Sequence, residues 1–249
     1  VRRRIPPGYA WPLAGIFVLG GLQGLVGWLM VASGLVDDPR VSPFRLTLHL
    51  ALAFAIFGAM LWTALSLAFP RSSEHGAPDT PRLRRLAVAM VALVFVMVIS
   101  GGFVAGIRAG FAYNTFPLMN GRVVPSEILL LEPAWKNFFW NMATVQFDHR
   151  LIAWLLALLV PLLAWRVSRA GAPRRARHAA TALVAMLAIQ VSLGIATLVN
   201  IVPLPLAALH QAGAVAVFGL ALAFAHALRA PRPAIEHLPK RARRAMMGD

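Results

Sequence analysis

Three histidines lie inside strongly apolar stretches of this chain, and their side chains are the ones best suited to bind a metal or a cofactor. They are His49, His149 and His210. A charged or strongly polar side chain in hydrocarbon costs several kcal/mol, roughly 2.5 to 3.5 on insertion scales, so one that is retained there usually serves a site. The chain has no cysteine, which excludes disulfides, thiolate metal sites and a cysteine nucleophile. Any metal or cofactor must therefore be held by His, Met or oxygen ligands.

The densest polar cluster surrounds His149. Gln146, His149 and Arg150 stand at i, i+3 and i+4, so a helix places all three on one face. Arg150 could bind a carboxylate of a cofactor held at His149, or it could extend along the helix to reach the lipid headgroups. Asp148 could orient an imidazole or balance the charge of Arg150, and both roles stay open.

The elements that must position these residues are membrane-spanning helices. Hydrophobic residues make up 59% of the chain and charged residues 13%, and the mean hydropathy is +0.70, which is outside the range of soluble domains. A span of about 30 Å of hydrocarbon needs about 20 apolar residues. An all-α polytopic membrane helix bundle with six transmembrane helices is predicted, over Trp11–Ser33, Phe44–Phe69, Leu86–Ile107, Asn141–Trp165, Ala179–Asn200 and Pro205–Leu228.

The basic residues predict the orientation of this bundle. About 18 of the 24 Lys and Arg residues lie in the N-terminal segment, in two loops and in the C-terminal tail, which the positive-inside rule assigns to the cytoplasm. Both termini are therefore expected to be cytoplasmic. Orientation also explains the net charge of +15, so we expect no binding to nucleic acid. The longest outer segment, with its amphipathic Ile128–Trp140 part, is expected to form an ordered cap at the membrane interface.

Two glycine patterns permit close contact between helices. They are Gly20-xxx-Gly24 in the first span and Gly102-xxx-Gly106-xxx-Gly110 in the third. Small residues at this spacing let two helix backbones approach, but glycine is also frequent in transmembrane helices in general. Both explanations stay open.

An internal repeat indicates how the helices are organised. Gln23-xxx-Gly27 followed by His49 resembles Gln190-xxx-Gly194 followed by His210, so the first two spans look like a copy of the last two. Parallel repeats of this kind are common in membrane bundles. With a four-helix unit, we expect the back half of an N-terminal repeat at 1–70, a cytoplasmic linker at 71–85, a complete repeat at 86–229 and a basic tail at 230–249.

The three intramembrane histidines are expected at one depth, because each lies five to nine residues inside a helix that runs from outside to inside. Three imidazoles at one level predict axial ligation of haem iron, with His149 and His210 as an opposed pair and His49 as the repeat equivalent of His210. Alternatively, each imidazole only hydrogen-bonds a neighbouring helix. The other histidines are expected in solvated loops or, for His226, at the interface: His75, His178, His226 and His237.

The joined motifs resemble the Cox15/CtaA family of haem A synthases, and in particular the cysteine-free branch of alphaproteobacteria and mitochondria. The likeness covers nearly the whole chain. It is carried by residues 20–35 (GGLQGLVGWLMVASGL), 41–46 (VSPFRL) with His49, 103–122 (FVAGIRAGFAYNTFPLMNGR), 146–150 (QFDHR) and 209–211 (LHQ).

This resemblance implies a multi-pass enzyme of the bacterial inner membrane, with eight helices in two four-helix pseudo-symmetric halves. It implies oxidation of the C8 methyl of haem O to the formyl group of haem A, for cytochrome c oxidase. His149 and His210 match the ligands of a haem b iron, and His49 matches a ligand of the substrate haem iron. The implied partners are haem O, haem A, the lipid bilayer, haem O synthase and oxidase assembly factors, with homo-oligomerisation left open.

The family pattern also includes an upstream helix pair with a catalytic Glu and a His-Arg motif that supplies the second substrate ligand. Neither occurs here, so a truncated chain of uncertain activity is expected. Two other functions stay open: a haem b-binding membrane protein for electron transfer or haem handling, and an assembly partner without a cofactor. A haem spectrum and an analysis of the bound pigment distinguish the three.

Overall fold

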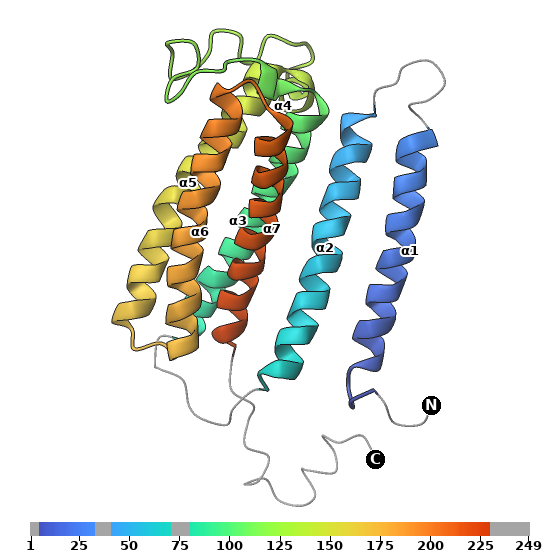
Figure 1. Cartoon of the computed structure of the whole chain (residues 1–249), viewed down its shortest axis with the longest axis vertical. Coiled ribbons are helices and arrows are strands. Elements are labelled where there is room, and N and C mark those ends of the chain that lie inside the picture. Colours follow the sequence, from blue (N-terminus) through green and yellow to red (C-terminus); the bar gives the residue numbers. More distant parts are fainter. Residues whose placement is uncertain (1–4, 33–40, 71–79, 230–249) are drawn as a thin grey trace, which may run out of the picture.

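The described chain is built from helices. The computed structural model describes residues 5–32, 41–70 and 80–229. Its long helices are α1 (Ala10–Ala32), α2 (Pro43–Ala68), α3 (Thr80–Gly106), α5 (Met142–Arg169), α6 (Arg174–Val199) and α7 (Leu204–Ala227). Each is long and apolar enough to cross a membrane. Within the described ranges the only β-structure is one isolated bridge, between Met119 and Arg122. The predicted all-α, multi-pass fold is confirmed (Figure 1).

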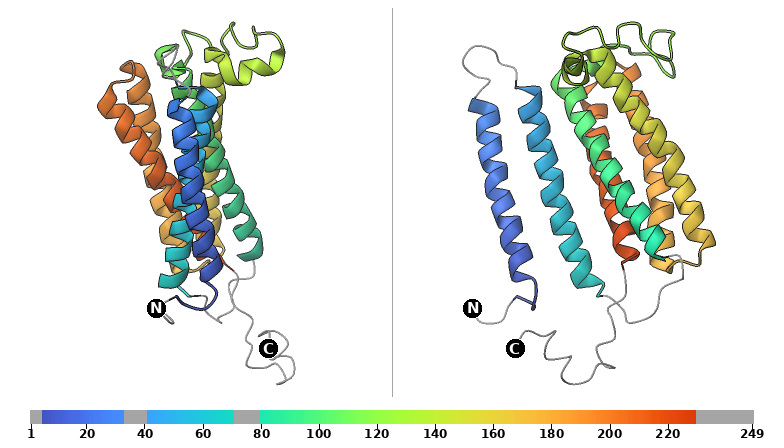
Figure 2. Two further views of the ribbon diagram at one scale, coloured as in Figure 1. Left: turned by 90° about the vertical axis from the view of Figure 1, so that its right-hand side faces the viewer. Right: turned by 180° about the vertical axis from the view of Figure 1, so that it is seen from behind.

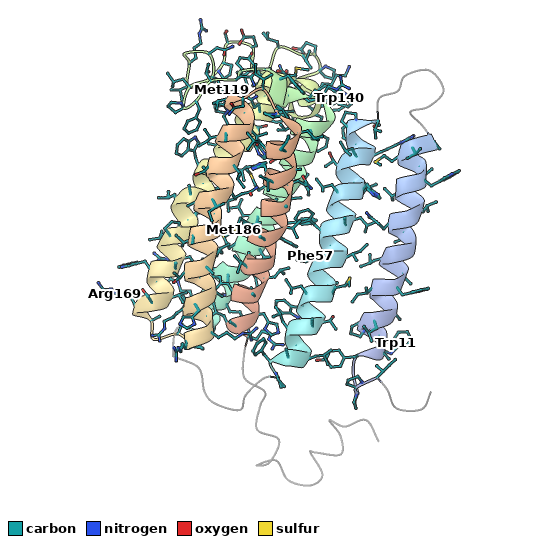
Figure 3. The ribbon with its side chains drawn as sticks, in the orientation of Figure 1. Trp11, Phe57, Met119, Trp140, Arg169 and Met186 are labelled. Atoms are coloured by element: carbon teal, nitrogen blue, oxygen red, sulfur yellow. The ribbon has the colours of Figure 1, made fainter. Side chains whose placement is uncertain are left out.

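Four of the long helices form a closed ring. α3 packs against α5, α5 against α6, α6 against α7, and α7 against α3. α2 lies on the outside of this ring against α3 and α7, and α1 packs on α2 at the edge of the molecule (Figure 2). Phe57 of α2 reaches toward Phe218 of α7, with ring centroids 6.4 Å apart (Figure 3). The predicted tail 230–249, most of the linker 71–85, His75 and His237 lie outside the described residues.

Two helices begin earlier than the apolar spans predict. α3 starts at Thr80 and α6 at Arg174, whereas the predicted spans start at Leu86 and Ala179. Both early turns are rich in arginine. Long arginine side chains can reach water while the helix backbone continues, so a helix need not end where the apolar run ends.

The two ends of the ring differ in charge and structure. At the end that we call the basic end, α3, α5 and α6 carry eight described arginines beside the helix termini: Arg82, Arg84, Arg85, Arg166, Arg169, Arg174, Arg175 and Arg177. At the opposite end lies the segment that we call the cap, residues 107–141, with η1 (Ala109–Phe111), η2 (Ala134–Lys136) and α4 (Asn137–Trp140). The cap is folded, as predicted, but only the last part of Ile128–Trp140 is helical.

The α3 glycines of the predicted pattern provide close helix contacts, and Gly20 and Gly24 of α1 do not do so within the described chain. A β-carbon at Gly102 would lie 2.9 Å from Oγ1 of Thr47, and one at Gly106 would lie 2.8 Å from Cα of Pro43. Both partners belong to α2, so the glycines of α3 let α2 approach closely. No described atom lies within 4 Å of a β-carbon placed at Gly20 or Gly24.

Candidate functional site

The three intramembrane histidines lie at equivalent places in three helix hairpins. Each hairpin pairs a helix that ascends toward the cap with one that descends from it: α1 with α2, α3 with α5, and α6 with α7 (Figure 1). His49, His149 and His210 follow the first residues of α2, α5 and α7 by six, seven and six positions. At about 1.5 Å per residue, all three lie about 10 Å along their helices, which agrees with the predicted common depth.

Each histidine ring lies against a glycine of the other helix in its hairpin. The pairs are Gly27 with His49, Gly101 with His149 and Gly194 with His210. A β-carbon added to these glycines would lie 3.0, 3.3 and 2.8 Å, respectively, from Cε1 of the imidazole. Any side chain larger than hydrogen would therefore push the ring away from the ascending helix. The glycines therefore set the position of the imidazoles, and two of them, Gly27 and Gly194, belong to the Gln-xxx-Gly repeat.

The first and third hairpins also share one hydrogen bond. Nε2 of Gln23 donates to the backbone oxygen of His49 at 3.2 Å, and Nε2 of Gln190 donates to that of His210 at 2.9 Å. Within the described chain, Oε1 of both glutamines and Nδ1 of both histidines are buried without a hydrogen-bond partner. Buried polar atoms are usually paired, so the four atoms are exceptions that the two hairpins share.

His149 is oriented by a serine. Oγ of Ser100 lies 2.8 Å from Nδ1 of His149 and 2.8 Å from the backbone oxygen of Met97. A serine hydroxyl has one proton. When that proton is donated to the carbonyl of Met97, Oγ accepts from Nδ1–H of His149, and the lone pair of the imidazole is then on Nε2. Nε2 is the nitrogen left for a metal, in the way that second-shell partners set the tautomer of metal-bound histidines.

His149 and His210 come from diagonally opposed helices of the ring, since α5 and α7 are each neighbours of α3 and α6. No hydrogen bond from the described chain reaches Nε2 of either imidazole. Gly101 and Gly194, on the other two helices, leave room for the rings themselves, which pack against them. Two opposed imidazoles between helices suit a flat iron macrocycle, and no described group of three His, Asp or Glu residues offers a site for a bare metal ion.

Gln146 and Arg150 hold the cap rather than lining the space at His149. Nε2 of Gln146 donates to the backbone oxygens of Ala109 at 2.8 Å and Ala112 at 2.6 Å. Nη2 of Arg150 donates to the backbone oxygen of Tyr113 at 2.8 Å and to Oε1 of Gln146 at 2.9 Å. The shared helix face predicted from the sequence exists, but its two outer members bind the cap, and His149 contacts α3 instead.

The roles considered for the two neighbours of His149 stay predictions. Asp148 forms no hydrogen bond or ion pair with His149 or Arg150 in the described chain, and its two possible roles stay open. Nε of Arg150 is buried and has no described partner. The Nε–H group is thus available as a donor, and carboxylate binding by Arg150 stays a prediction.

His49 has a different environment from the other two. Nε2 of Gln23 lies 3.2 Å from Nε2 of His49, so the glutamine amide can donate to this imidazole. In the described chain α1 and α2 carry no second histidine. His49 could supply one axial ligand to a haem, and its role as a substrate ligand stays a prediction.

His226 is a buried residue that the sequence suggested would be interfacial. It is 1% exposed, its Nε2 lies 3.2 Å from Oγ of Ser66, and its ring meets Trp62 edge-on with centroids 5.1 Å apart. Nη1 of Arg229 also donates to Oγ of Ser66, at 3.0 Å. Because α2 packs over the end of α7, a position at the limit of the apolar span becomes enclosed between helices.

Comparison with known proteins finds one family and relatives that share one name. The family described as Cytochrome oxidase assembly protein (COX15-CtaA) matches residues 1–222. The Heme A synthase of Nitrosospira multiformis is 58% identical over 218 residues, which are 87% of this chain and 61% of that protein. The Heme A synthase of Rhodospirillum centenum is 47% identical over 231 residues, 93% of this chain and 61% of that protein. Heme A synthase COX15 of Arabidopsis thaliana is 40% identical over 232 residues, 90% of this chain and 51% of that protein. The chain thus spans about three fifths of the length of the bacterial relatives.

Proposed function

Because the chain belongs to the COX15-CtaA family of cytochrome oxidase assembly proteins, we propose that it functions in a haem A synthase of the bacterial inner membrane. The reaction is oxidation of the C8 methyl of haem O to the formyl group of haem A, which cytochrome c oxidase uses. The relatives named Heme A synthase support this reaction. In this proposal His149 and His210 ligate a haem b, and His49 ligates the iron of the substrate haem.

One observation carries the proposal of a haem b site. His149 and His210 stand on diagonally opposed helices at one depth, each with its ring against a glycine and with no described hydrogen bond to Nε2. A histidine that only stabilises helix packing would use its ring nitrogens in bonds to neighbouring helices. These two residues leave the coordinating nitrogen available.

The residues of the chain have separable roles at this site. Ser100 holds the proton of His149 on Nδ1, so that Nε2 can coordinate iron. Gly101 and Gly194 leave room for the two imidazole rings to pack against α3 and α6. Gln190 fixes the backbone of α7 at His210. A bound haem b supplies a redox centre for electron transfer, whose potential depends on its two axial ligands and their hydrogen bonds.

Arg150 is proposed to contribute at the outer edge of this site. Its free Nε donor could bind a haem propionate while Nη2 stays on the cap. Arginine pairs with carboxylates through more than one donor, so the cap and the cofactor would be linked through one side chain. On the substrate side, the amide of Gln23 donates to Nε2 of His49, so this bond would have to open before Nε2 binds iron. The bond from Gln23 to the backbone oxygen of His49 would remain.

The reduced-minus-oxidised spectrum of the protein expressed with haem tests the haem b assignment. We expect a b-type spectrum in the wild type and its loss in the double variant His149→Ala, His210→Ala. His178→Ala, an exposed residue of α6, is the matched control and should keep the spectrum. A wild-type signal that persists in the double variant would exclude this haem site.

A haem-binding protein for electron transfer is the second candidate function. It is favoured by a difference between the histidine pair in the ring and His49. The pair at His149 and His210 is complete within the described chain, whereas His49 has no described partner. Extraction of the pigment after co-expression with a source of haem O separates the two functions. Haem A in the extract supports the synthase, and haem b alone supports electron transfer or haem handling.

A further inference from the structure

A groove separate from the histidines runs between α3 and α5 in the half of the bundle nearest the basic end. It has a volume of about 170 Å³ and is lined by Leu86, Ala89, Met90, Leu93, Leu159, Leu162, Leu163 and Arg166. Met90 and Leu163 form its floor, at 5% and 6% exposure. Ala89 and Leu162 are exposed at its rim, so the groove opens on the outer surface of the ring, where lipid surrounds a membrane protein.

The lining indicates the kind of molecule that fits. Seven of its eight residues are apolar, and no hydroxyl, amide or imidazole is among them. A redox-active quinone head or a porphyrin would leave its polar atoms unpaired against such walls. A cavity of about 150 Å³ holds one benzene molecule, so this groove accommodates a short stretch of hydrocarbon chain. The walls therefore suit an acyl chain.

The mouth of the groove is positively charged. Arg166 is part of the lining. Arg82 and Arg85 precede Leu86 and Ala89 by four residues each, so they lie on the same face of α3, one turn nearer the basic end. The N-terminus of α3 adds the positive end of its helix dipole at this point. An anionic group at the mouth would meet several donors at once.

No acidic residue of the described chain neutralises this mouth. The described acidic residues are Glu127 and Glu132, in the cap, and Asp148, near the cap end of α5. They lie at the opposite end of the bundle from Arg166. Basic residues between transmembrane helices on the cytoplasmic side are a recognised arrangement for anionic lipid headgroups. The positive mouth suits an anionic headgroup, and the apolar walls below it suit an acyl chain. A single anionic lipid has both.

We propose that this groove is a binding site for an anionic phospholipid, with one acyl chain between α3 and α5 and the phosphate at Arg166, Arg82 and Arg85. The bound lipid covers the apolar floor and joins α3 to α5, which carry Gly101 and His149 further along the same two helices. The site is independent of the haem assignment. It requires only the groove and the charge at its mouth.

Native mass spectrometry of the delipidated full chain, titrated with dioleoyl phosphatidylglycerol or dioleoyl phosphatidylcholine, tests the proposal. The two lipids have the same chains and differ in net charge. We expect the wild type to bind one phosphatidylglycerol in preference to phosphatidylcholine. Arg166→Gln should weaken phosphatidylglycerol binding about fivefold, the effect of one basic residue near an anionic surface, and leave phosphatidylcholine unchanged. Ala89→Trp fills the groove and should weaken both.

Two matched controls complete the test. Arg177→Gln removes an arginine of α6 outside the lining, and Val88→Trp adds the same bulk on an exposed position of α3 next to the groove. Both should bind like the wild type. Equal binding of the two lipids, equal effects of Arg166→Gln and Arg177→Gln, or equal effects of Ala89→Trp and Val88→Trp would each overturn the site. Gel filtration and circular dichroism verify folding, and Ala89→Leu replaces Ala89→Trp if the tryptophan variant is not monodisperse.

Discussion

At the scale of single residues, the histidines are distinguished by what holds their rings. Ser100 of α3 lies beside Nδ1 of His149, whereas in the other two hairpins a glutamine binds the backbone oxygen of the histidine. Gln23 also donates to Nε2 of His49, so that Ser100 and Gln23 each contact an imidazole ring. His149 is the histidine with a described partner on Nδ1, and this partner should influence any metal that binds Nε2.

Substitution of Ser100 by alanine tests this influence. Loss of the acceptor at Nδ1 frees the imidazole to rotate and to change tautomer. Loss of such a hydrogen-bond partner typically lowers metal affinity about 10- to 100-fold, and we expect a decrease of this size for haem b. A haem titration followed by absorbance measures the change. Ser100→Thr keeps the hydroxyl and should restore most of the affinity. Equal affinities in the alanine and threonine variants would contradict an orienting role for the hydroxyl.

Gly194 makes the tightest of the three glycine contacts, so we expect Gly194→Ala to displace the ring of His210. The added carbon would lie 2.8 Å from Cε1, well inside the usual contact distance between carbon atoms, about 3.5 to 4.0 Å. The expected result is a low-spin b-type spectrum that is lost or much reduced while the protein still folds. Gly21→Ala, where no described atom lies within 4 Å, is the control and should keep the full spectrum.

At the scale of elements, the cap is tied to the helices by side chains that also neighbour the histidine site. Gln146 and Arg150 bind its backbone from α5. Nδ2 of Asn114 donates to the backbone oxygen of Leu198, at the end of α6, at 2.8 Å. The cap is thus connected to two helices that surround the site. Changes in the cap should reach the ligands through α5.

The cap also contains one pH-sensitive contact, between Tyr113 and Glu127. Hydrogen bonds from its own backbone and from the Tyr113 hydroxyl lower the pKa of Glu127 below its ordinary 4.5. Burial and the hydrogen bond to Glu127 raise the pKa of Tyr113 above 10.0. Because its pKa is lowered, ionised Glu127 stabilises the fold above pH 4.5, and this stabilisation is lost as the pH falls. Because its pKa is raised, protonated Tyr113 stabilises the fold below pH 10.0, and this stabilisation is lost as the pH rises.

We therefore expect segment 113–127 to open more readily below about pH 4.5. Hydrogen exchange of cap peptides, corrected for the intrinsic pH dependence of exchange, measures this opening. Tyr113→Phe removes the hydroxyl, so it should reduce the additional pH dependence, and peptides of α6 serve as the internal control. The same pH profile in the wild type and in Tyr113→Phe would rule out the contact as its source.

At the scale of the whole molecule, charge divides the bundle into two unlike ends (Figures 1 and 3). Arg169 marks the basic end of α5, and Met119 and Trp140 lie in the cap at the other end. An uneven distribution of Lys and Arg orients a membrane protein with its basic loops in the cytoplasm. The ends of the ring should accordingly lie on opposite sides of the membrane, and the histidines should lie in the half nearest the outer surface.

The absence of cysteine from the chain makes this orientation directly measurable. Ser126→Cys places one thiol in the cap, and Ser168→Cys places one at the basic end; both positions are exposed. A membrane-impermeant maleimide should label Ser126→Cys on intact spheroplasts, and it should label Ser168→Cys only after lysis. The reverse pattern would place the cap and the histidines near the cytoplasm.

The number of apolar helices and their approximate positions follow from the amino-acid sequence, because hydrocarbon requires about 20 apolar residues for each span. The equal depth of His49, His149 and His210 also follows from it, since rise per residue is constant along a helix. The likeness of the two Gln-xxx-Gly hairpins was readable in the same way. All of these properties depend on spacing along one chain.

Which side chains meet depends on how the helices and the cap pack together. Gln146 and Arg150 share a helix face with His149, yet they bind cap carbonyls, and no pattern in the sequence indicates where an irregular segment places its backbone oxygens. Ser100 became the partner of His149 because α3 and α5 pack together, although 49 residues separate the two. The opposition of His149 and His210 likewise depends on the closed ring of α3, α5, α6 and α7, because a contact between helices is a property of their packing and not of either helix alone.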